Sequence, residues 1–400
     1  MNKATYNILY IHQDALITGS AISLRNMIAG INQSLFEIYV VVPMDGPAIQ
    51  IWKDAGATVF IFNYKTFWTS PGPACFSRNN VKQLAALLPN KALKSFVLNL
   101  NPDLIHINDK AALQVGVSLK NCGIPIIQHS RSAYHLTACK LNKYLSSKSI
   151  IQYASHIICI SEDEMQQFEH LQNKSIMFNT VNLEDAKIAQ QNRLAIRSQL
   201  NIGEDEIVIG MAENIGIYKG LFDIIDIIKL LKEKCIQQYK IVIVGKIDDN
   251  DTIHVNDFQG STYAYFQKII AEKKVEKNVI LAGFQKEPLA YIAAMDLLLV
   301  SKQHGVLGRQ PIEAQSLGTA VLAVNGHSKK STILINGVGG YLVDSVEELK
   351  QKLLVLISNP SQLKSLGAKG QEYAMKHFDL NQYGKKIEEL YLKIIDKCKQ

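Results

Sequence analysis

Short apolar runs alternate with longer helix-like segments along most of the 400-residue chain, and this alternation constrains the fold more than any other feature. In the first half, β-prone runs lie at 7–12, 38–43, 57–62, 103–107, 125–129 and 156–161. In the second half, similar runs lie at 207–212, 240–245, 278–283, 296–301, 320–325 and 340–343. Strands that alternate with helices predict parallel sheets covered by helices. We therefore expect an α/β protein with two Rossmann-like, doubly wound domains.

The length of the chain also favours two domains, because single cores stop growing near about 250 to 300 residues. A polar, helix-like stretch at 184–206 carries little apolar periodicity and marks the predicted boundary. We expect domains at 1–185 and 200–380, followed by a terminal segment at 381–400. The helix expected there, at 382–399, carries one apolar stripe made of Ile387, Leu390, Tyr391, Ile394 and Ile395.

The charge of the chain limits its partners. There are 43 Lys and Arg against 36 Asp and Glu, a formal net charge of +7. An excess of this size favours phosphate-bearing small molecules or an anionic membrane surface. We interpret the charge as diffuse, because no dense basic block interleaved with aromatic residues stands out, and we expect no nucleic acid partner.

The cysteine and histidine patterns indicate no metal. The six cysteines are widely spaced without a C-x-x-C pair, so neither a zinc knuckle nor a disulfide framework is expected. No three of the ten histidines have metal-ligand spacing, so we expect no metal and no other cofactor. The sequence shows no signal-peptide pattern and no apolar stretch of about 18 residues. We expect a cytoplasmic protein whose only membrane contact would be peripheral.

Several motifs follow one another along the chain. In the second half they are IVIGMAENIGIYKG (207–220), IVIVG (241–245), NVILAGF (278–284) and LLVSKQHGVLGRQPIEAQSLGTAVLAV (298–324). In the first half they are NPDLIHIND, IPIIQHSRS, ASHIICISEDE and FNTVN. In this order and spacing, the sequence resembles the retaining glycosyltransferases of group 1, also called family 4, which have the GT-B architecture.

The resemblance implies an acceptor domain at 1–185 and a nucleotide-sugar donor domain at 200–380, facing each other across a cleft. It also implies that segment 381–400 crosses back to the first domain. The implied reaction is metal-independent transfer of a sugar from a nucleotide diphosphate sugar to a glycan or lipid-linked glycan, with retention of configuration. The leaving diphosphate would accept the acceptor's proton, so no side-chain base is required.

The donor domain carries most of the candidate site. Lys219 is expected to neutralise the diphosphate, and Gly220 would let the backbone come close to it; a solvated loop lysine is the alternative. Glu313 matches the carboxylate that binds the ribose hydroxyls, although a glutamate stabilised by a helix N-terminus fits the same position. Arg309 could reach phosphate or an acidic sugar. The other expected donor contacts are Asn214, Gly283, Phe284, His304 and Gly308.

Two places in the first domain complete the candidate site. Gly19 and Ser20 stand where a strand turns into a helix and could present amides to phosphate, although a glycine there also suits a plain turn. His129 ends a strand and matches the family's cleft histidine, which contacts the transferred sugar; a structural histidine is the alternative. We expect His129, Lys219 and Glu313 to be the catalytic residues.

The donor motif departs from the family at several positions. A Gly-Arg pair before Lys-Gly, the first of two glutamates, and a Gly-Gly pair with a following glutamate are all replaced. The residues found there are Glu213, Asn214, Gly305, Ser328, Lys329 and Thr332.

Two explanations compete. In one, the enzyme is active on an unusual donor, with Arg309, Lys329 or Lys330 supplying positive charge and His304 contacting the sugar. In the other, the chain is a degraded subunit that binds or stabilises a partner transferase. We favour the active enzyme, because a drifting pocket would lose its charged residues first. A nucleotide-sugar epimerase would need a dense acid-base set, which the sequence lacks.

Two basic segments suggest a membrane-facing surface. The segment 91–100 and the stretch with Lys140, Lys143 and Lys148 could place basic and apolar residues on one face against anionic lipid. A solvated helix explains the same pattern. Membrane contact would suit a lipid-linked acceptor.

Overall fold

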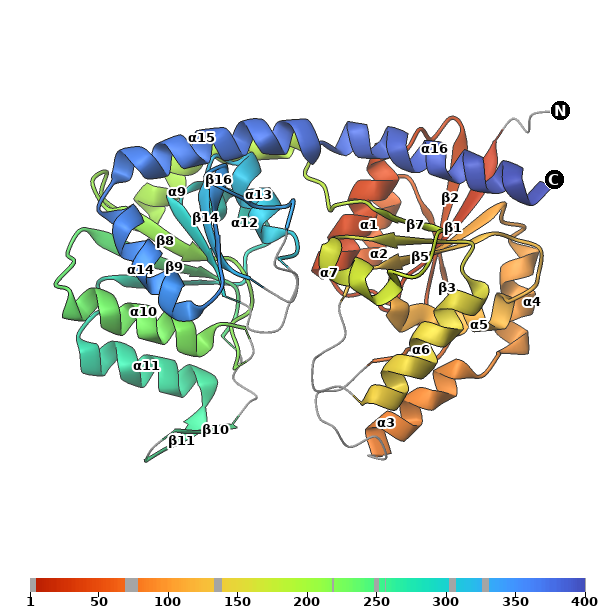
Figure 1. The fold of residues 1–400 in the computed structure, drawn as a ribbon, viewed down its shortest axis with the longest axis horizontal. Coiled ribbons are helices and arrows are strands. Elements are labelled where there is room, and N and C mark those ends of the chain that lie inside the picture. Colours follow the sequence, from red (N-terminus) through yellow and green to blue (C-terminus); the bar gives the residue numbers. More distant parts are fainter. Residues whose placement is uncertain are drawn as a thin grey trace. The chain divides into compact units, whose positions relative to one another are not determined.

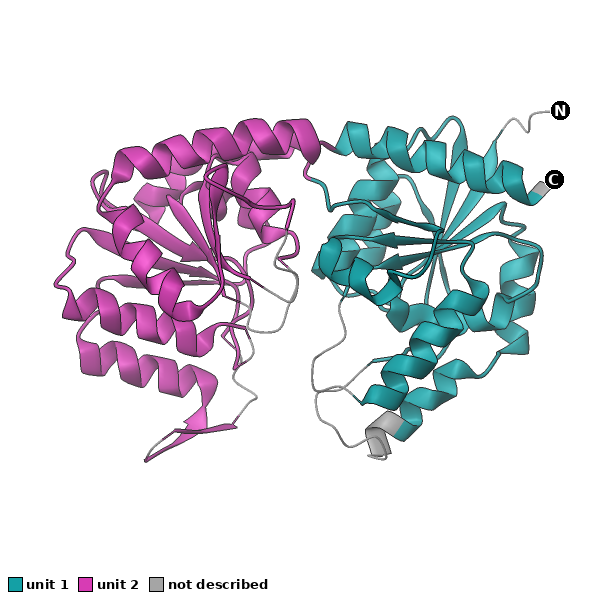
Figure 2. Ribbon diagram, viewed as in Figure 1, with its two compact units in different colours: residues 1–180, 380–400 teal, residues 181–379 magenta. Residues whose placement is uncertain are grey.

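The protein is described by a computed structural model that covers residues 5–68, 78–132, 139–217, 219–247, 252–255, 257–301, 307–325 and 331–399. It forms two compact units (Figures 1 and 2). Unit 1 contains residues 1–180 and 380–400, and unit 2 contains residues 181–379. Each unit is built on a seven-stranded sheet, so the expected α/β class with two Rossmann-like domains is confirmed.

The sheet of unit 1 has the strand order β3-β2-β1-β4-β5-β6-β7, and all its strand pairs are parallel. The strands are β1 (Tyr6–Ile11), β2 (Phe36–Val42), β3 (Thr58–Ile61), β4 (Leu104–Ile107), β5 (Ile126–Ser130), β6 (His156–Cys159) and β7 (Lys174–Ile176). The chain runs outward from β1 to β3 and then returns to β4, on the other side of β1. Doubly wound sheets bind ligands at such a reversal, outside the carboxyl ends of the strands. Six strands match predicted runs, but β7 was missed because Lys-Ser-Ile is short and only partly buried.

Helices cover both faces of this sheet (Figure 1). They are α1 (Gly19–Gly30), α2 (Ala48–Asp54), α3 (Arg78–Gln83), α4 (Lys91–Asn99), α5 (Leu113–Leu119), α6 (Lys140–Tyr153), α7 (Glu162–Met165) and α16 (Leu380–Lys399). Successive strand residues point to opposite faces. Ile8 and Tyr10 of β1 therefore pack with α1, α2 and α16, while Leu9 and Ile11 pack with α4, α5 and α6.

The terminal helix α16 packs on unit 1 along the stripe that the sequence predicts. The residues of the stripe are Ile387, Tyr391, Ile394 and Ile395, which are buried, and Leu390, which is partly buried. The helix contacts α1 where a Cβ added at Gly384 would collide with the carbonyl oxygen of Gly30. The two glycines therefore let the backbones of α1 and α16 touch.

The sheet of unit 2 repeats this arrangement, with the order β12-β9-β8-β13-β14-β16-β15. The strands are β8 (Ile207–Met211), β9 (Tyr239–Val244), β12 (Val279–Gly283), β13 (Leu297–Val300), β14 (Ala320–Val324), β15 (Ile335–Asn336) and β16 (Gly339–Val343). The strand order reverses between β8 and β13. The sequence did not predict the two-residue β15, nor the antiparallel pair β10 (Thr252–Val255) and β11 (Phe258–Ser261).

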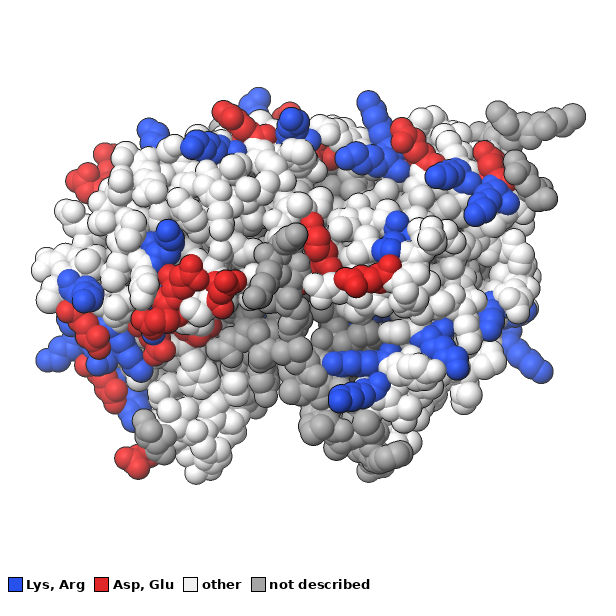
Figure 3. Space-filling view, viewed as in Figure 1, with Lys and Arg blue, Asp and Glu red and all other residues white. Residues whose placement is uncertain are grey.

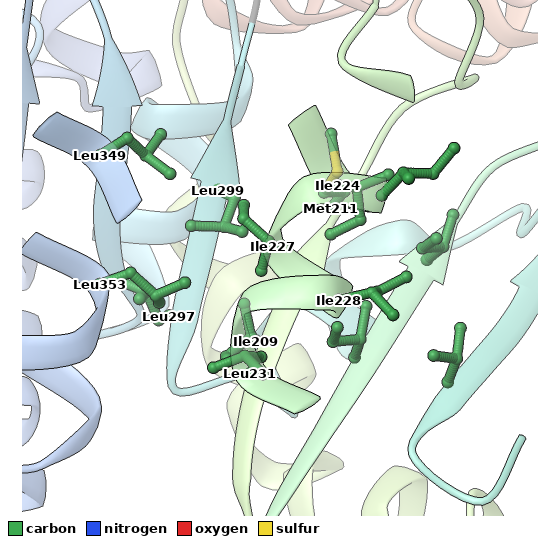
Figure 4. Close-up of a cluster of buried hydrophobic side chains, with 14 of the residues drawn as sticks. Ile209, Met211, Ile224, Ile227, Ile228, Leu231, Leu297, Leu299, Leu349 and Leu353 are labelled. Atoms are coloured by element: carbon green, nitrogen blue, oxygen red, sulfur yellow. The ribbon is translucent and has the colours of Figure 1, made fainter. Parts of the chain in front are cut away.

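Helices also pack around the second sheet. They are α8 (Leu183–Gln191), α9 (Arg193–Gln199), α10 (Leu221–Glu233), α11 (Thr262–Lys273), α12 (Pro288–Ala293), α13 (Gln310–Ser316), α14 (Val346–Ile357) and α15 (Pro360–His377). Figure 4 shows side chains of β8 and β13 in one apolar cluster with those of α10 and α14. The labelled members are Ile209, Met211, Ile224, Ile227, Ile228, Leu231, Leu297, Leu299, Leu349 and Leu353. This cluster fixes the two strands at the reversal point.

The polar stretch at 184–206 belongs to unit 2, where α8 and α9 pack against α12. Two of its arginines anchor the stretch to the rest of unit 2, as buried apolar side chains anchor other helices. Arg197 contacts Asp296 Oδ2 at 3.2 Å, and Arg193 contacts Asp296 Oδ1 at 2.5 Å. Arg197 also donates to the carbonyl oxygens of Gly203, Glu206 and Ala294. Anchoring through charge explains why this stretch shows little apolar periodicity.

The cysteines include one pairing that their spacing did not predict. Cys139 is disulfide-bonded, whereas Cys122, Cys159, Cys235 and Cys398 are free. Disulfide pairing depends on tertiary placement, so widely spaced cysteines give no local signal for it. None of the helices in the described ranges is long and apolar enough to cross a membrane.

Replacing Arg197 by Met should destabilise unit 2. Arg197 is 6% exposed, and its four hydrogen bonds would be lost, which leaves three backbone carbonyl oxygens without this donor and Asp296 with Arg193 alone. We expect the free energy of unfolding, measured by urea denaturation, to fall by about 3 kcal/mol. Lys187→Met, at an exposed position of α8, is the control and should change stability by less than about 0.5 kcal/mol. Equal effects of the two substitutions would contradict this account of the polar stretch.

Candidate functional site

Lys219 lies in the loop between β8 and α10, at the carboxyl edge of the unit 2 sheet, with its side chain exposed. Gly220, which ends the loop, has a φ of +80°, and a Cβ there would lie 2.8 Å from the carbonyl oxygen of Ser301. Only glycine suits both the positive φ and the close approach. The hydroxyl of Ser301 in turn donates to Asp223 in the first turn of α10. The loop of Lys219 is therefore held against the end of β13.

The residues that replace the family's Gly-Arg pair support the loops themselves. Asn214 Oδ1 accepts a hydrogen bond from the backbone N–H of Lys246 at 2.9 Å. The carbonyl group of Glu213 contacts Gly245, where an added Cβ would collide with it. The N–H of Gly245 donates to the carbonyl oxygen of Gly283 at 2.8 Å. The loops after β8, β9 and β12 are thus joined, and Asn214 serves this joint.

Glu313 lies in the first turn of α13, and Arg309 immediately precedes that helix. Nε and Nη2 of Arg309 donate to Oε1 of Glu313 at 2.9 and 2.6 Å. Nε2 of Gln310 donates to the carbonyl oxygen of Ala212 at 2.7 Å, which ties the start of α13 to the loop of Lys219. Because Arg309 and Glu313 are paired, a ligand that binds one of them also meets the charge of the other.

Two further glycines shape the same edge of unit 2. Gly283 and Gly308 have φ values of +67° and +66°, and no heavy atom lies within 4 Å of a Cβ added at Gly283. Phe284 is 55% exposed and lines a pocket of about 570 Å³ with residues of α9 and α12. Lys219 and Glu313 do not line this pocket. A donor contact by Phe284 stays a prediction.

Some candidates cannot be placed. His304, Gly305, Ser328, Lys329 and Lys330 lie outside the described residues. Within the ranges that are described, no group of three or more His, Cys, Asp or Glu could hold a metal ion. Metal independence stays a prediction.

Gly19 and Ser20 begin α1 at the carboxyl end of β1. Thr18 caps the helix, with its Oγ1 accepting a hydrogen bond from the N–H of Ala21. The hydroxyl of Ser20 lies 3.0 Å from Oγ1 of Thr18 and accepts from Nε2 of Gln13 at 3.0 Å. With that hydroxyl engaged, the first backbone amides of α1 are the groups that fit an anion.

His129 is the penultimate residue of β5 and is 1% exposed. Its Nδ1 lies 3.1 Å from Nε2 of His106 and 3.3 Å from Nη2 of Arg131. Its Nε2 has no hydrogen-bond partner in the described part of the chain. Burial, reinforced by Arg131 and then by His106, holds the pKa of His129 well below its usual range. The ring is therefore neutral near pH 7.

Sequence reasoning missed two buried charged residues at the same edge of unit 1. Lys110 follows β4 and Glu164 lies in α7, with exposures of 6% and 0%. Burial raises the pKa of Glu164 to about 7 and lowers the pKa of Lys110 to about 8. Glu164 Oε2 accepts from the hydroxyl of Ser161 at 2.6 Å, whereas Oε1 has no partner among the described residues. The Ser-x-x-Glu pattern that starts at Ser161 is a helix-start signal that could have drawn attention to Glu164.

A family model and several known proteins match this chain. Residues 192–373 match the family model described as "Glycosyl transferases group 1". The chain is 22% identical to the alpha-monoglucosyldiacylglycerol synthase of Acholeplasma laidlawii over 406 residues, covering 96% of this chain and 95% of that enzyme. It is 26% identical to the trehalose synthase of Pyrococcus horikoshii over 220 residues, 53% of this chain, and the match spans about half (49%) of that relative's length.

Solved structures show the same fold. HepE of Anabaena, crystallised in complex with UDP, superposes with a TM-score of 0.77 at 19% identity, covering 97% of this chain and 100% of that chain. The same protein in complex with UDP-glucose gives a TM-score of 0.76 at 19% identity, covering 97% of this chain and 99% of that one.

The raised pKa of Glu164 has a measurable effect on stability. The pKa of Glu164 rises from 4.5 to about 7 on folding. At a pH where Glu164 is protonated in both the folded and the unfolded state, this shift does not change the free energy of unfolding. Above pH 7 it lowers the free energy of unfolding by its full amount. Glu164→Gln cannot ionise, so its free energy of unfolding relative to the wild type should rise by roughly 2 to 3 kcal/mol between pH 5 and pH 8. Urea denaturation at both pH values measures this difference. Glu169→Gln, at an exposed position, should show no such gain, and parallel curves for wild type and Glu164→Gln would refute the assignment.

Proposed function

We propose that this chain, which belongs to the group 1 glycosyltransferases and has their GT-B fold, transfers a sugar from a nucleotide diphosphate sugar to a glycan or lipid-linked glycan, without a metal and with retention of configuration. Unit 2 would hold the donor and unit 1 the acceptor. The observation that carries the proposal is the joint between the loop of Lys219 and the start of α13, made by Gln310 and Ala212. This joint brings Lys219 and the Arg309–Glu313 pair to one edge of the sheet. The UDP and UDP-glucose complexes of HepE support a uridine donor as the first to test.

The proposed step needs one bond made and one broken at the anomeric carbon. An acceptor hydroxyl oxygen would bond to that carbon on the face from which the diphosphate leaves, and a departing phosphate oxygen would take the hydroxyl proton. Lys219 and the amides of the first turn of α10 would stabilise the charge of the diphosphate. Glu313 would accept hydrogen bonds from the ribose hydroxyls, with Arg309 holding its carboxylate in position.

The alternative of a degraded binding subunit is not favoured. Arg309 and Glu313 form an ion pair whose side chains are 16% and 12% exposed. Largely buried charge pairs cost desolvation energy, and drift without function would remove them. Arg309 also supplies a cation beside Gln310, whose side chain bonds to the loop after β8.

The net positive charge is unevenly distributed along the chain, because one segment is poor in acids. Residues 55–161 contain eleven Lys and Arg but only two acids, Asp103 and Asp109, so this segment has a net charge of +9. That exceeds the +7 of the whole chain. Figure 3 shows blue side chains without red ones over the region of α6.

We propose that α6 contacts an anionic membrane surface. Lys140 and Lys148 are exposed on it beside Leu141 and Tyr144, which are 41% and 59% exposed. Basic and apolar residues on one helix face suit the interface of an anionic bilayer. The name of the Acholeplasma relative denotes synthesis of a glucosyl diacylglycerol, which supports a lipid-linked acceptor.

Nucleotide binding tests the donor site. Calorimetric titration of UDP, GDP, ADP and CMP should identify one base, and EDTA should leave the affinity unchanged. Lys219→Met should weaken nucleoside diphosphate binding by about 10- to 100-fold, since a charge-assisted hydrogen bond contributes about 1.5 to 3 kcal/mol. Lys234→Met, just beyond α10 and exposed, should bind like the wild type. If no nucleotide binds the wild type, the donor proposal fails and the degraded subunit becomes the better reading.

Vesicle flotation tests the membrane proposal. The wild type should float with vesicles of phosphatidylcholine and phosphatidylglycerol, not with phosphatidylcholine alone, and high salt should release it. The double variant Lys140→Gln/Lys148→Gln should partition about 30-fold less, because each lysine contributes about 1 kcal/mol near such a surface. Lys364→Gln/Lys369→Gln, exposed on α15, is the charge-matched control. Absence of flotation, or an equal loss in the control, would rule out α6 as the contact.

A further inference from the structure

Four buried side chains of unit 1 form one continuous chain of hydrogen bonds. The hydroxyl of Tyr10 lies 2.9 Å from that of Tyr391, which lies 2.5 Å from Nδ1 of His106. Nε2 of His106 lies 3.1 Å from Nδ1 of His129. The four residues come from β1, α16, β4 and β5 and are at most 1% exposed, so solvent does not compete for these bonds.

Taken alone, such a chain can run in two directions. A tyrosine hydroxyl and a neutral imidazole each have one hydrogen to donate. In the first direction, His106 donates through Nε2, and Nδ1 of His129 accepts. In the second, His129 donates through Nδ1 to Nε2 of His106, His106 donates through Nδ1 to Tyr391, and Tyr391 donates to Tyr10.

We infer that Arg131 selects the first direction and so holds His129 as a ring that carries its hydrogen on Nε2. Nη2 of Arg131 lies 3.3 Å from Nδ1 of His129, and a guanidinium group can only donate. Nδ1 of His129 must then accept, and His106 must donate to it. The second direction would set two N–H groups against each other at Nδ1.

The orientation of Arg131 is fixed by other residues. Its Nε donates to Oδ1 of Asn108 at 2.8 Å, and its Nη1 donates to Oδ1 of Asn179 at 2.9 Å. Oδ1 of Asn179 also accepts from the hydroxyl of Ser23 on α1 at 2.9 Å. Arg131 is therefore a positioning residue that acts on the site through His129.

Among the titratable groups around His129, one is ionised near pH 7. These groups are His106 on β4, Tyr10 on β1, Tyr383 and Tyr391 on α16, Cys159 on β6, and Arg131. Burial raises the pKa of each tyrosine and raises the pKa of the Cys159 thiol to about 12, while it lowers the pKa of His106. All five are neutral near pH 7. Arg131 is thus the ionised member of this group, and it opposes protonation of His129.

A ring held in this way is a hydrogen-bond donor and not a base. Nε2 of His129 already carries its hydrogen, so it can donate to an oxygen with a free lone pair, such as a hydroxyl of the transferred sugar. That choice of ligand rests on the proposed function, whereas the direction of the chain does not. The terminal helix gains a role in the site, because the hydroxyl of Tyr391 donates to His106.

Ring nitrogens labelled with ¹⁵N in the full-length chain test the direction. Long-range ¹H–¹⁵N correlations show which nitrogen carries hydrogen, and loss in His129→Asn identifies the His129 signals. We expect wild-type His129 to be neutral with its hydrogen on Nε2 between pH 5 and pH 8. Arg131→Met should admit the Nδ1–H form or the charged ring, whereas Arg131→Lys and the exposed control Lys120→Met should keep the wild-type pattern.

The wild-type spectrum alone tests the direction of the hydrogen-bond chain, even if Arg131→Met fails to fold. Hydrogen on Nδ1, or a charged ring at pH 6, would overturn the inference, as would a wild-type pattern in folded Arg131→Met. In a sugar-transfer assay, Arg131→Met should lose activity relative to the wild type, because a ring with its hydrogen on Nδ1 cannot donate through Nε2, and Arg131→Lys should keep it. A wild type that transfers no sugar would count against the proposed function and leave the ring-nitrogen result standing.

Discussion

Every candidate site residue depends on the parallel pairing of the strands in its sheet. Parallel strands end at one edge, and the helical crossovers return the chain to the other. In unit 2 that edge collects Lys219 after β8 and Glu313 after β13, because the strand order reverses between these two strands. In unit 1 it collects Ser20 after β1 and His129 at the end of β5. Residues far apart in the sequence come to the same edge for this reason alone.

The sequence predicted what leaves a periodic or motif signal. Strands such as β13 are buried on both faces and appear as apolar runs, and the stripe of α16 appears at helical spacing. The edge strand β7 and the β10–β11 pair are short and only partly buried, so no run marks them. Lys219 and Glu313 are candidates because of their motif, and their functions stay predictions. The bond from Arg309 to Glu313 and the burial of Glu164 were not predicted, because they depend on side-chain direction and on the packing of α7, which spacing does not encode.

Averages over the chain concealed the distribution of charge. The acids and bases of the other segments nearly cancel, so residues 55–161 carry more than the entire excess. A net charge of +9 in one segment creates a positive potential at one surface, which reaches about one Debye length into the solvent. The same charge spread evenly over the chain would not. The segment lies in the domain that would bind the acceptor. The sequence also concealed what the replaced donor residues do. Asn214 occupies the family's arginine position, but its side chain bonds the loop after β8 to the loop after β9.

Unpaired buried polar atoms concentrate at the edge of unit 1 that carries the candidate site. Nε2 of His12 and Oε1 of Gln13 follow β1, Nε2 of His129 and Oγ of Ser130 end β5, and Oε1 of Glu164 follows β6, all without partners in the described part of the chain. Each such atom costs about 1 to 3 kcal/mol when buried without a hydrogen bond. Native proteins keep few of them, and those that persist call for an explanation such as a bound ligand. A sugar or phosphate presents hydroxyls and oxygens that would satisfy donors and acceptors alike, so these atoms suit a polar ligand of the kind proposed here.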